Sequence, residues 1–424
     1  MTPRAGGPSN LAELEVLAGH RARSLTMKHL LAYMLVVGVG CGTGVHSNPG
    51  VPPDGPPVMV PDGPLPDAPL ETQRLGMNDI SIVASTIFPD VSRRITGIGH
   101  TRDVVPRALY ARLATSHGDI IDDFDKFMVF GIRFDLCDRL VTGPCPEGVD
   151  GSLRLVFQPL GFPISATDVG LHAFYTIPAA ELGYVINELR AVARLEGTGP
   201  MIDGGLTGLH NLSTEGEMRL DALLDRYAIA DRLIRLDLMG QDARSSVPHV
   251  VFRGIELHDG QWNDIPVADV DATQQDAALT GSDPSYDVTP VADRPQNLAL
   301  TLTSDAFNAA APAAQRDALD ALVATQNPQL HTSSGGSSTV QCVACHVATY
   351  LAVHRAQVAA IALDSLPSRF QTTHDARITD GISTTTPGSL HNFGWLGPNV
   401  AISQRAANET AMVLDEIQQR FPVP

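Results

Sequence analysis

The stretch that decides the fold class is Leu171-His172-Ala173-Phe174-Tyr175-Thr176-Ile177, followed after Pro178 by a different pattern over residues 179–195. The first part is rich in aromatic, β-branched and apolar residues, which is typical of a β-strand. In the second part apolar residues recur at spacings of three and four, which predicts a helix with one buried face. A strand followed directly by a helix indicates a domain that contains both.

Five more runs have the composition of strands and are separated by Gly, Pro and Asp: residues 80–84, 127–134, 153–157, 233–238 and 250–257. A second helical pattern covers residues 215–227 and follows Ser213, a candidate N-cap. Strands on both sides of a few helices predict an α+β domain with a mainly antiparallel sheet over residues 78–263.

The last third of the chain has a different pattern. Residues 264–296 are rich in Asp, Thr and Pro, and we expect them to link two domains. Three helical patterns follow, at residues 313–325, 342–363 and 402–421. They predict a second, small and mostly helical domain over residues 297–424.

The second of these helices begins with Cys342-Val343-Ala344-Cys345-His346. Cys-x-x-Cys-His is the attachment motif of c-type haem. On one turn of helix both thiols can reach the two haem vinyl groups, while His346 ligates the iron on the proximal side. With 5 Cys and 14 His in 424 residues, chance gives about 0.002 such motifs. The match therefore favours covalently bound haem c.

Two other uses of the motif cysteines compete with this interpretation. Cys342 and Cys345 can form half of a zinc site, but the usual second pair of Cys or His at close spacing is missing. They can also form a dithiol redox centre, but such a centre follows a strand in a βαβ unit, whereas residues 333–338 are a Ser/Gly loop. The sequence favours haem over both.

Residues 297–424 resemble a single-haem c-type cytochrome in the position of the motif and in the helix that ends the chain. The export signal described below agrees with this resemblance. The resemblance implies transfer of single electrons, with His346 as the proximal ligand. It also implies a distal ligand from a loop just before the last helix, where His391 stands. His331 is the alternative, and Met412 is a weak one because we expect it in mid-helix.

Two other classes of function compete with an electron carrier. An iron with an open sixth position would suit a haem peroxidase or a small-ligand sensor, although the sequence has no second attachment motif. In a binding lipoprotein, the α+β domain would carry the main role. Neither Gly-x-Ser-x-Gly nor His-Glu-x-x-His occurs, so we assign no catalytic residue and favour an electron carrier over an enzyme.

Covalent haem attachment takes place outside the cytoplasm, and the N-terminus carries a matching export signal. Met27, the expected true start, precedes Lys28 and a short apolar run at residues 30–40. The end of this run, Gly38-Val39-Gly40-Cys41, resembles a bacterial lipobox, with Gly38 at a position where Leu is usual. We therefore expect lipid on Cys41.

The export signal sets the expected organisation of the N-terminal part. Residues 1–41 are the signal segment, and residues 42–77, rich in Pro, Gly and Asp, form a tether to the membrane. The expected location is the cell envelope, in the periplasm or at the outer membrane surface. In that oxidising compartment Cys137 and Cys145, which flank a short Thr-Gly-Pro loop, are expected to form a disulfide.

The chain has a formal net charge of -18. A negative field of this size disfavours nucleic acid as a partner and favours a basic redox partner protein. The expected partners are therefore that protein and, through the lipid anchor, a membrane.

Overall fold

The computed structural model describes residues 70–84, 93–94, 97–98, 104–114, 121–136, 147–159, 169–196, 209–210, 212–241, 249–267, 270–279, 286–290, 300, 302–324, 346, 351–352, 354–363, 393–396 and 399–423. All of them belong to one compact unit, Val60–Pro424. None of the described helices is both long enough and apolar enough to span a membrane.

The described strands form one large sheet and a separate hairpin. The main path of the sheet has the order β12-β11-β9-β8-β6-β5-β4-β1-β7, with β10, β2 and β3 paired off this path. Neighbours on the path are antiparallel except β1 and β7. The strands are β1 (Ser81–Ala84), β2 (Arg93–Arg94), β3 (Gly97–Ile98), β4 (Phe127–Leu136), β5 (Val149–Pro159), β6 (Gly170–Pro178), β7 (Leu209–His210), β8 (Leu233–Gln241), β9 (His249–His258), β10 (Gln261–Asp264), β11 (Gln274–Leu279), β12 (Tyr286–Thr289), and the hairpin β13 (Phe393–Leu396) and β14 (Asn399–Ile402).

The prediction of an α+β fold with a mainly antiparallel sheet is confirmed. The strand-like runs lie within β4, β5, β6, β8 and β9, and the first run overlaps β1. β4 and β5 are longer than their apolar runs, because the ladder continues through a register pair of buried polar residues, Asp135 and Ser152. A prediction from composition alone places the end of a strand where its apolar residues end.

The helices agree with most of the predicted patterns. Residues 179–195, 215–227, 313–325 and 402–421 correspond to α3, α4, α7 and α10, and the described part of residues 342–363 is partly helical. The helices are α1 (Met77–Ile80), α2 (Arg107–Ala114), η1 (Ile121–Lys126), α3 (Ala179–Glu196), α4 (Thr214–Tyr227), η3 (Ala230–Arg232), α6 (Ser304–Ala309), α7 (Pro312–Ala324) and α10 (Gln404–Arg420).

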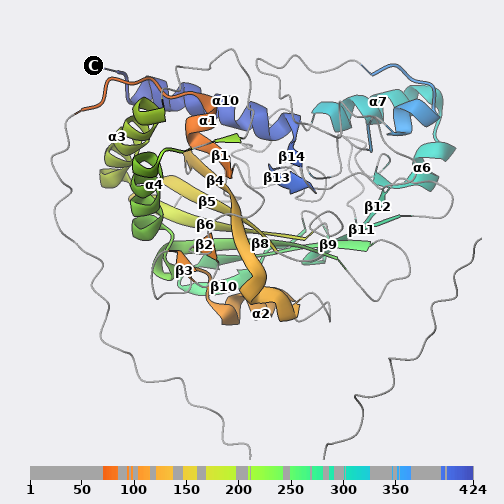
Figure 1. The fold of residues 1–424 in the computed structure, drawn as a ribbon. Coiled ribbons are helices and arrows are strands. Elements are labelled where there is room, and N and C mark those ends of the chain that lie inside the picture. Colours follow the sequence, from red (N-terminus) through yellow and green to blue (C-terminus); the bar gives the residue numbers. More distant parts are fainter. Residues whose placement is uncertain are drawn as a thin grey trace, which may run out of the picture. The chain divides into compact units, whose positions relative to one another are not determined.

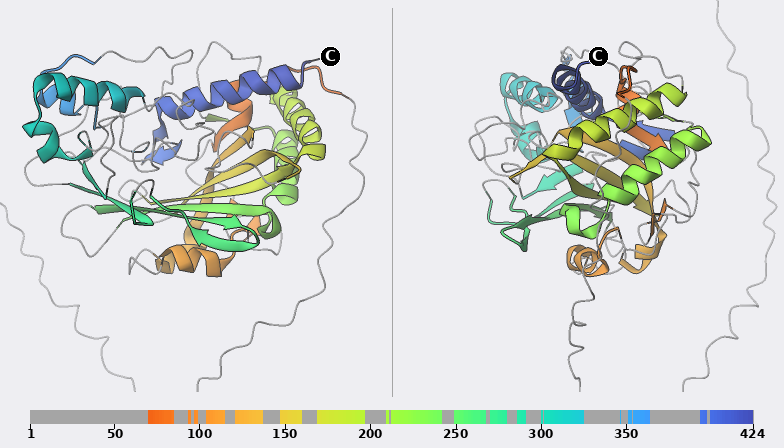
Figure 2. Two further views of the ribbon diagram at one scale, coloured as in Figure 1. Left: turned by 180° about the vertical axis from the view of Figure 1, so that it is seen from behind. Right: turned by 90° about the vertical axis from the view of Figure 1, so that its left-hand side faces the viewer.

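These helices cover the sheet on both faces. Figure 1 shows α10 along one face and α2 beyond the other, with α3 and α4 across one end of the strands. The two views of Figure 2 show the same arrangement. The central strands are therefore buried on both sides, which agrees with the unbroken burial of every residue in β4.

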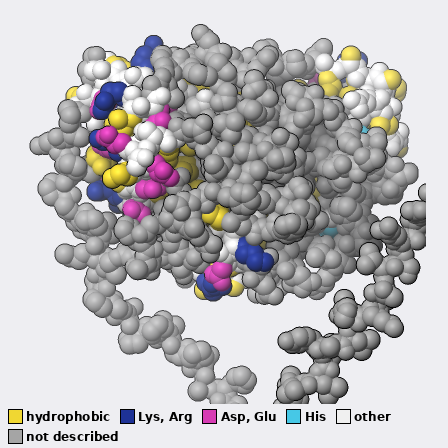
Figure 3. Space-filling view, viewed as in Figure 1, with side chains coloured by type: hydrophobic (Ala, Val, Ile, Leu, Met, Phe, Trp, Pro, Cys, Tyr) yellow, Lys and Arg dark blue, Asp and Glu magenta, His cyan; other side chains and the backbone are white. Residues whose placement is uncertain are grey.

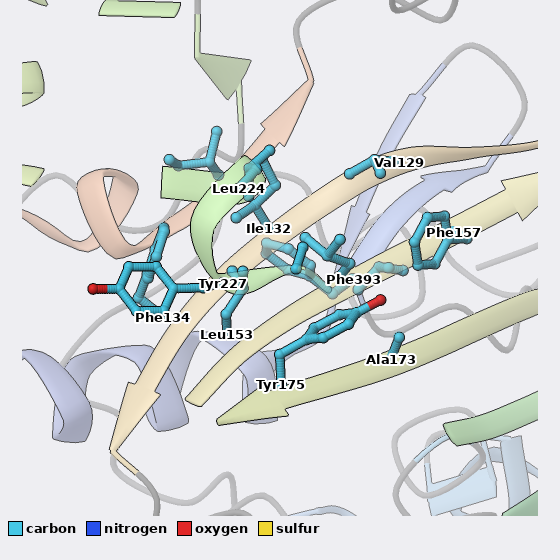
Figure 4. Packing of buried hydrophobic residues seen from close by; sticks show 14 of the residues in the cluster. Val129, Ile132, Phe134, Leu153, Phe157, Ala173, Tyr175, Leu224, Tyr227 and Phe393 are labelled. Carbon is cyan, nitrogen blue, oxygen red and sulfur yellow. The ribbon is translucent and has the colours of Figure 1, made fainter. Parts of the chain in front are cut away.

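One part of the core lies between the central strands and α4. Leu153 and Tyr175 from the sheet, and Leu224 and Tyr227 from α4, belong to a single cluster of buried apolar residues (Figure 4). The buried hydroxyl of Tyr175 donates a hydrogen bond to the carbonyl oxygen of Val104 at 3.0 Å. The aromatic rings thus fill this side of the sheet without leaving the phenol of Tyr175 unpaired.

The opposite face of the sheet is covered by α10 and β13. The hydroxyls of Ser81 in β1 and Thr410 in α10 lie 2.8 Å apart. Gly131 in β4 lies under Phe393, and a Cβ atom at Gly131 would be 2.8 Å from that ring. Glycine is needed here because the ring packs directly on the backbone of the strand.

No separate helical haem domain is shown, and this differs from our expectation for residues 297–424. The apolar stripe predicted for the last helix exists, but it belongs to the same buried cluster as β1 and β4: Ala406, Ala407, Ala411, Val413, Leu414 and Ile417. A stripe on a helix predicts burial without identifying the surface that buries it. The helix was expected to pack on other helices and instead packs on the sheet.

We expected residues 264–296 to be a linker and residues 42–77 to be a tether. The described parts of both segments belong to the folded unit. Within residues 264–296, β11 and β12 extend the sheet beyond β9. Their Asp and Gln residues are common in loops, but side chains of this kind are tolerated near a sheet edge. At the end of the expected tether, Leu75 and Met77 are buried, so the core begins earlier than residue 78.

Ser213 provides a first test of the fold. Its Oγ accepts a hydrogen bond from the amide of Gly216 at 3.2 Å, which confirms the predicted N-cap of α4. We expect Ser213→Ala to lower the free energy of unfolding by about 1 kcal/mol, measured by urea denaturation. Ser213→Thr is the control and should retain most of the stability, because threonine also caps helices. Equal losses in the two variants would contradict a capping role.

Candidate functional site

The structure describes two of the predicted site residues, His346 and Met412. The others lie outside the described residues: Cys41, Cys137, Cys145, His331, Cys342, Cys345 and His391. Met412 is half-buried on α10, the helix that packs on β1 and β4. The expected ligand roles of His331, His391 and Met412 stay predictions.

His346, the histidine of the motif, lies against the large sheet. It is helical and half-buried. Its ring centre is 6.2 Å from that of His172 in β6 and 5.1 Å from that of Phe252 in β9. His346 therefore lies beside strands β6 and β9 of the sheet.

The face that His346 contacts can be identified from the strand register. His172 pairs with Asp237 of β8, which in turn pairs with Gly254 of β9. Phe252 lies two residues from Gly254 and so points to the same face. This face also carries Phe174, two residues from His172, with the two ring centres 6.4 Å apart.

Beside His172, a row of mostly charged residues crosses the same face. Successive register partners form this arginine row: Arg133 in β4, Arg154 in β5, Phe174 in β6, Arg235 in β8 and Glu256 in β9. The guanidinium carbons of Arg154 and Arg235 lie 4.9 and 5.4 Å from the centre of the Phe174 ring. Two cations thus flank one aromatic ring, an arrangement that the electron density of the ring stabilises.

The ion pairs in the arginine row differ in length. Arg235 pairs with Asp237 at 2.9 Å. Among the described residues, Arg154 pairs with Asp135 at 3.5 Å and shares that carboxylate with Arg133. Burial, and next the nearby charge of Arg133, lower the pKa of Arg154. Within the described part of the chain the Nε of Arg154 donates no hydrogen bond. The carboxylates of Asp135, Glu409 and Asp237 partly offset this lowering of the pKa, so Arg154 is a buried cation among several anions.

The row continues under α10. Arg133 is almost fully buried and pairs with Glu409 at 3.1 Å, and Glu409 also accepts a hydrogen bond from Arg405 at 2.8 Å. Burial alone would raise the pKa of Glu409, but the neighbouring guanidiniums, Arg405 foremost, lower it to about 2. This carboxylate is therefore held in its charged form by the cations around it.

The chemistry of these side chains fits a haem. Imidazole nitrogen is an iron ligand, the rings of Phe252 and Phe174 are apolar, and guanidinium groups pair with carboxylates such as those a haem carries. Among the described residues, no group of three or more His, Cys, Asp and Glu side chains is placed to hold a metal ion.

Sequence reasoning did not identify His172, Phe252 or the arginine row. The only local signal was the presence of His172, Arg154 and Arg235 inside otherwise apolar strands. Such residues also occur in strands with one solvent-exposed face, so the pattern alone did not distinguish a site from a surface.

In the described part of the face seen in Figure 3, acidic and basic side chains are mixed over α3 and α4. Several of them form ion pairs, such as Arg219 with Glu188 and Arg226 with Glu181. The basic redox partner stays a prediction. No protein-family model, curated protein or solved structure compared with the chain matches it.

Proposed function

We propose that the protein is a membrane-tethered monohaem c-type cytochrome that carries single electrons in the cell envelope. The observation that supports this most directly is the position of His346. The histidine of the Cys-x-x-Cys-His motif lies near an imidazole and a phenyl ring on one face of the sheet. A haem ligand needs this kind of partly enclosed, apolar surrounding, since burial of the haem is one of the factors that set its potential.

In the proposed protein, each group of residues has a distinct role. The bound haem supplies an iron that changes oxidation state by one electron. Cys342 and Cys345 hold the haem covalently and His346 ligates the iron. Phe252 excludes water beside His346, and Arg154 provides positive charge for a carboxylate.

The proposed location follows from the N-terminal sequence. Residues 1–41 direct export, Cys41 carries the lipid, and the Pro/Gly-rich residues after it hold the folded unit away from the membrane. A net charge of -18 favours a basic electron donor or acceptor, and association with it should slow as the salt concentration rises.

The test is to produce the protein together with a c-type haem maturation system. We expect about one haem and one iron per chain, a low-spin visible spectrum, and a potentiometric titration that fits a single one-electron step. Stoichiometric zinc without haem would overturn the proposal. A high-spin spectrum that shifts on addition of carbon monoxide would replace the electron carrier with a haem peroxidase or a small-ligand sensor.

A further inference from the structure

We propose that His172, in strand β6 of the sheet, is the second axial ligand of the haem iron that His346 binds. This inference rests on the proposed function. It assigns to the α+β domain the role of supplying the sixth ligand, in place of the loop histidine expected from the sequence.

The two imidazole rings are separated by the distance expected for two ligands of one metal atom. With metal–nitrogen bonds of about 2 Å and imidazole rings about 2 Å across, two rings on opposite sides of one metal have centres about 6 Å apart. The ring centres of His346 and His172 are 6.2 Å apart, and their planes are inclined by 46°. The rings are therefore tilted and not stacked. The separation of their centres equals the one that a single metal atom bound by both imidazoles requires.

The distance between the ring centres also distinguishes a haem iron from a tetrahedral zinc. Two imidazoles on a tetrahedral metal lie at about 109° to each other rather than opposite, so their ring centres would be about 5 Å apart. The observed 6.2 Å agrees better with two ligands on opposite sides of one iron. Cys342 and Cys345 are then left for covalent attachment of the haem, as the motif requires.

His172 is also held as a ligand should be. It is the third residue of β6, and its register partners are Val156 in β5 on one side and Asp237 in β8 on the other. A side chain on a central strand is more precisely placed than one on a loop. The surroundings suit the propionates of a haem, because the guanidinium of Arg154 lies over Phe174, whose ring is adjacent to that of His172.

The experiment uses the full-length, haem-loaded protein and its ferric spectrum. Wild type should be low spin, as expected for two histidine ligands. His172→Ala should keep about one covalent haem per chain and become fully high spin at neutral pH. Added imidazole should restore the low-spin spectrum by occupying the vacated position.

Two further variants keep the result interpretable. His258→Ala removes an exposed histidine at the end of β9 and should leave the low-spin spectrum unchanged. His172→Met keeps a ligand in place, and should show the spectrum of histidine–methionine ligation if His172→Ala fails to fold.

Other outcomes separate the inference from the function on which it rests. A low-spin His172→Ala protein, together with a high-spin His391→Ala or His331→Ala protein, would overturn the inference and leave the cytochrome in place. A wild-type protein without haem would overturn the proposed function itself.

Discussion

Replacing both Cys342 and Cys345 with alanine is expected to abolish covalent haem, from about one per chain to none. Each thiol can form one bond to a haem vinyl group, and without them only coordination by histidine remains, which denaturation breaks. Haem staining of a denaturing gel, with protein from the same maturation system, measures the loss. Circular dichroism should show that the sheet still forms, since its described core includes neither residue.

The matched control is Cys137→Ala with Cys145→Ala, which removes the expected disulfide instead of the motif. This double variant should be less stable but keep its haem, because a disulfide acts mainly on the unfolded chain. Haem that survives denaturation in the Cys342 and Cys345 variant would contradict attachment at the motif. Loss of haem from both double variants would point to misfolding instead.

Glu409→Gln is expected to lower the free energy of unfolding by about 3 kcal/mol at pH 7. Glu409 accepts hydrogen bonds from the nearly buried Arg133 and Arg405. Glutamine keeps the size of the side chain but removes the charge, so two buried cations lose a shared partner. Urea denaturation measures the difference. Glu416→Gln is the control on the same helix: its ion pair with Arg420 is looser, at 3.9 Å, and should contribute less than about 1 kcal/mol.

The same carboxylate should make stability depend on pH. The pKa of Glu409 is lowered in the folded protein from 4.5 to about 2. A group with a lowered folded pKa stabilises the fold above its unfolded pKa, and this contribution disappears as the pH falls through the folded pKa. The difference between wild type and Glu409→Gln should therefore be constant from pH 7 to 5 and shrink between about pH 4.5 and 2. A difference that stays constant down to pH 3 would contradict the pairing.

Local sequence patterns predicted much of the fold and little of the site. Strand composition and helical spacing depend on neighbouring residues, so β4, β5, β6, α3 and α4 were all expected. The packing of α10 on β1 was not, because an apolar stripe does not specify its partner. The division into two domains relied on composition between residues 264 and 296, where β11 and β12 continue the sheet.

The candidate site shows the same limit. His346 was identified because its motif is contiguous in the sequence. His172 lies in another part of the chain and meets His346 only through tertiary packing. The arginine row arises from the register between neighbouring strands. The sequence of a single strand does not specify this register. Such long-range pairs are set by the whole fold.

The contact between Ser81 and Thr410 joins residues 329 positions apart, and it constrains the order in which the chain can fold. The first strand of the sheet completes its burial only when the last helix has arrived, and contacts this distant in sequence form slowly. If the chain is exported from its N-terminus, as we propose, residues 342–346 cross the membrane before α10 does, and therefore before the burial of β1 is complete.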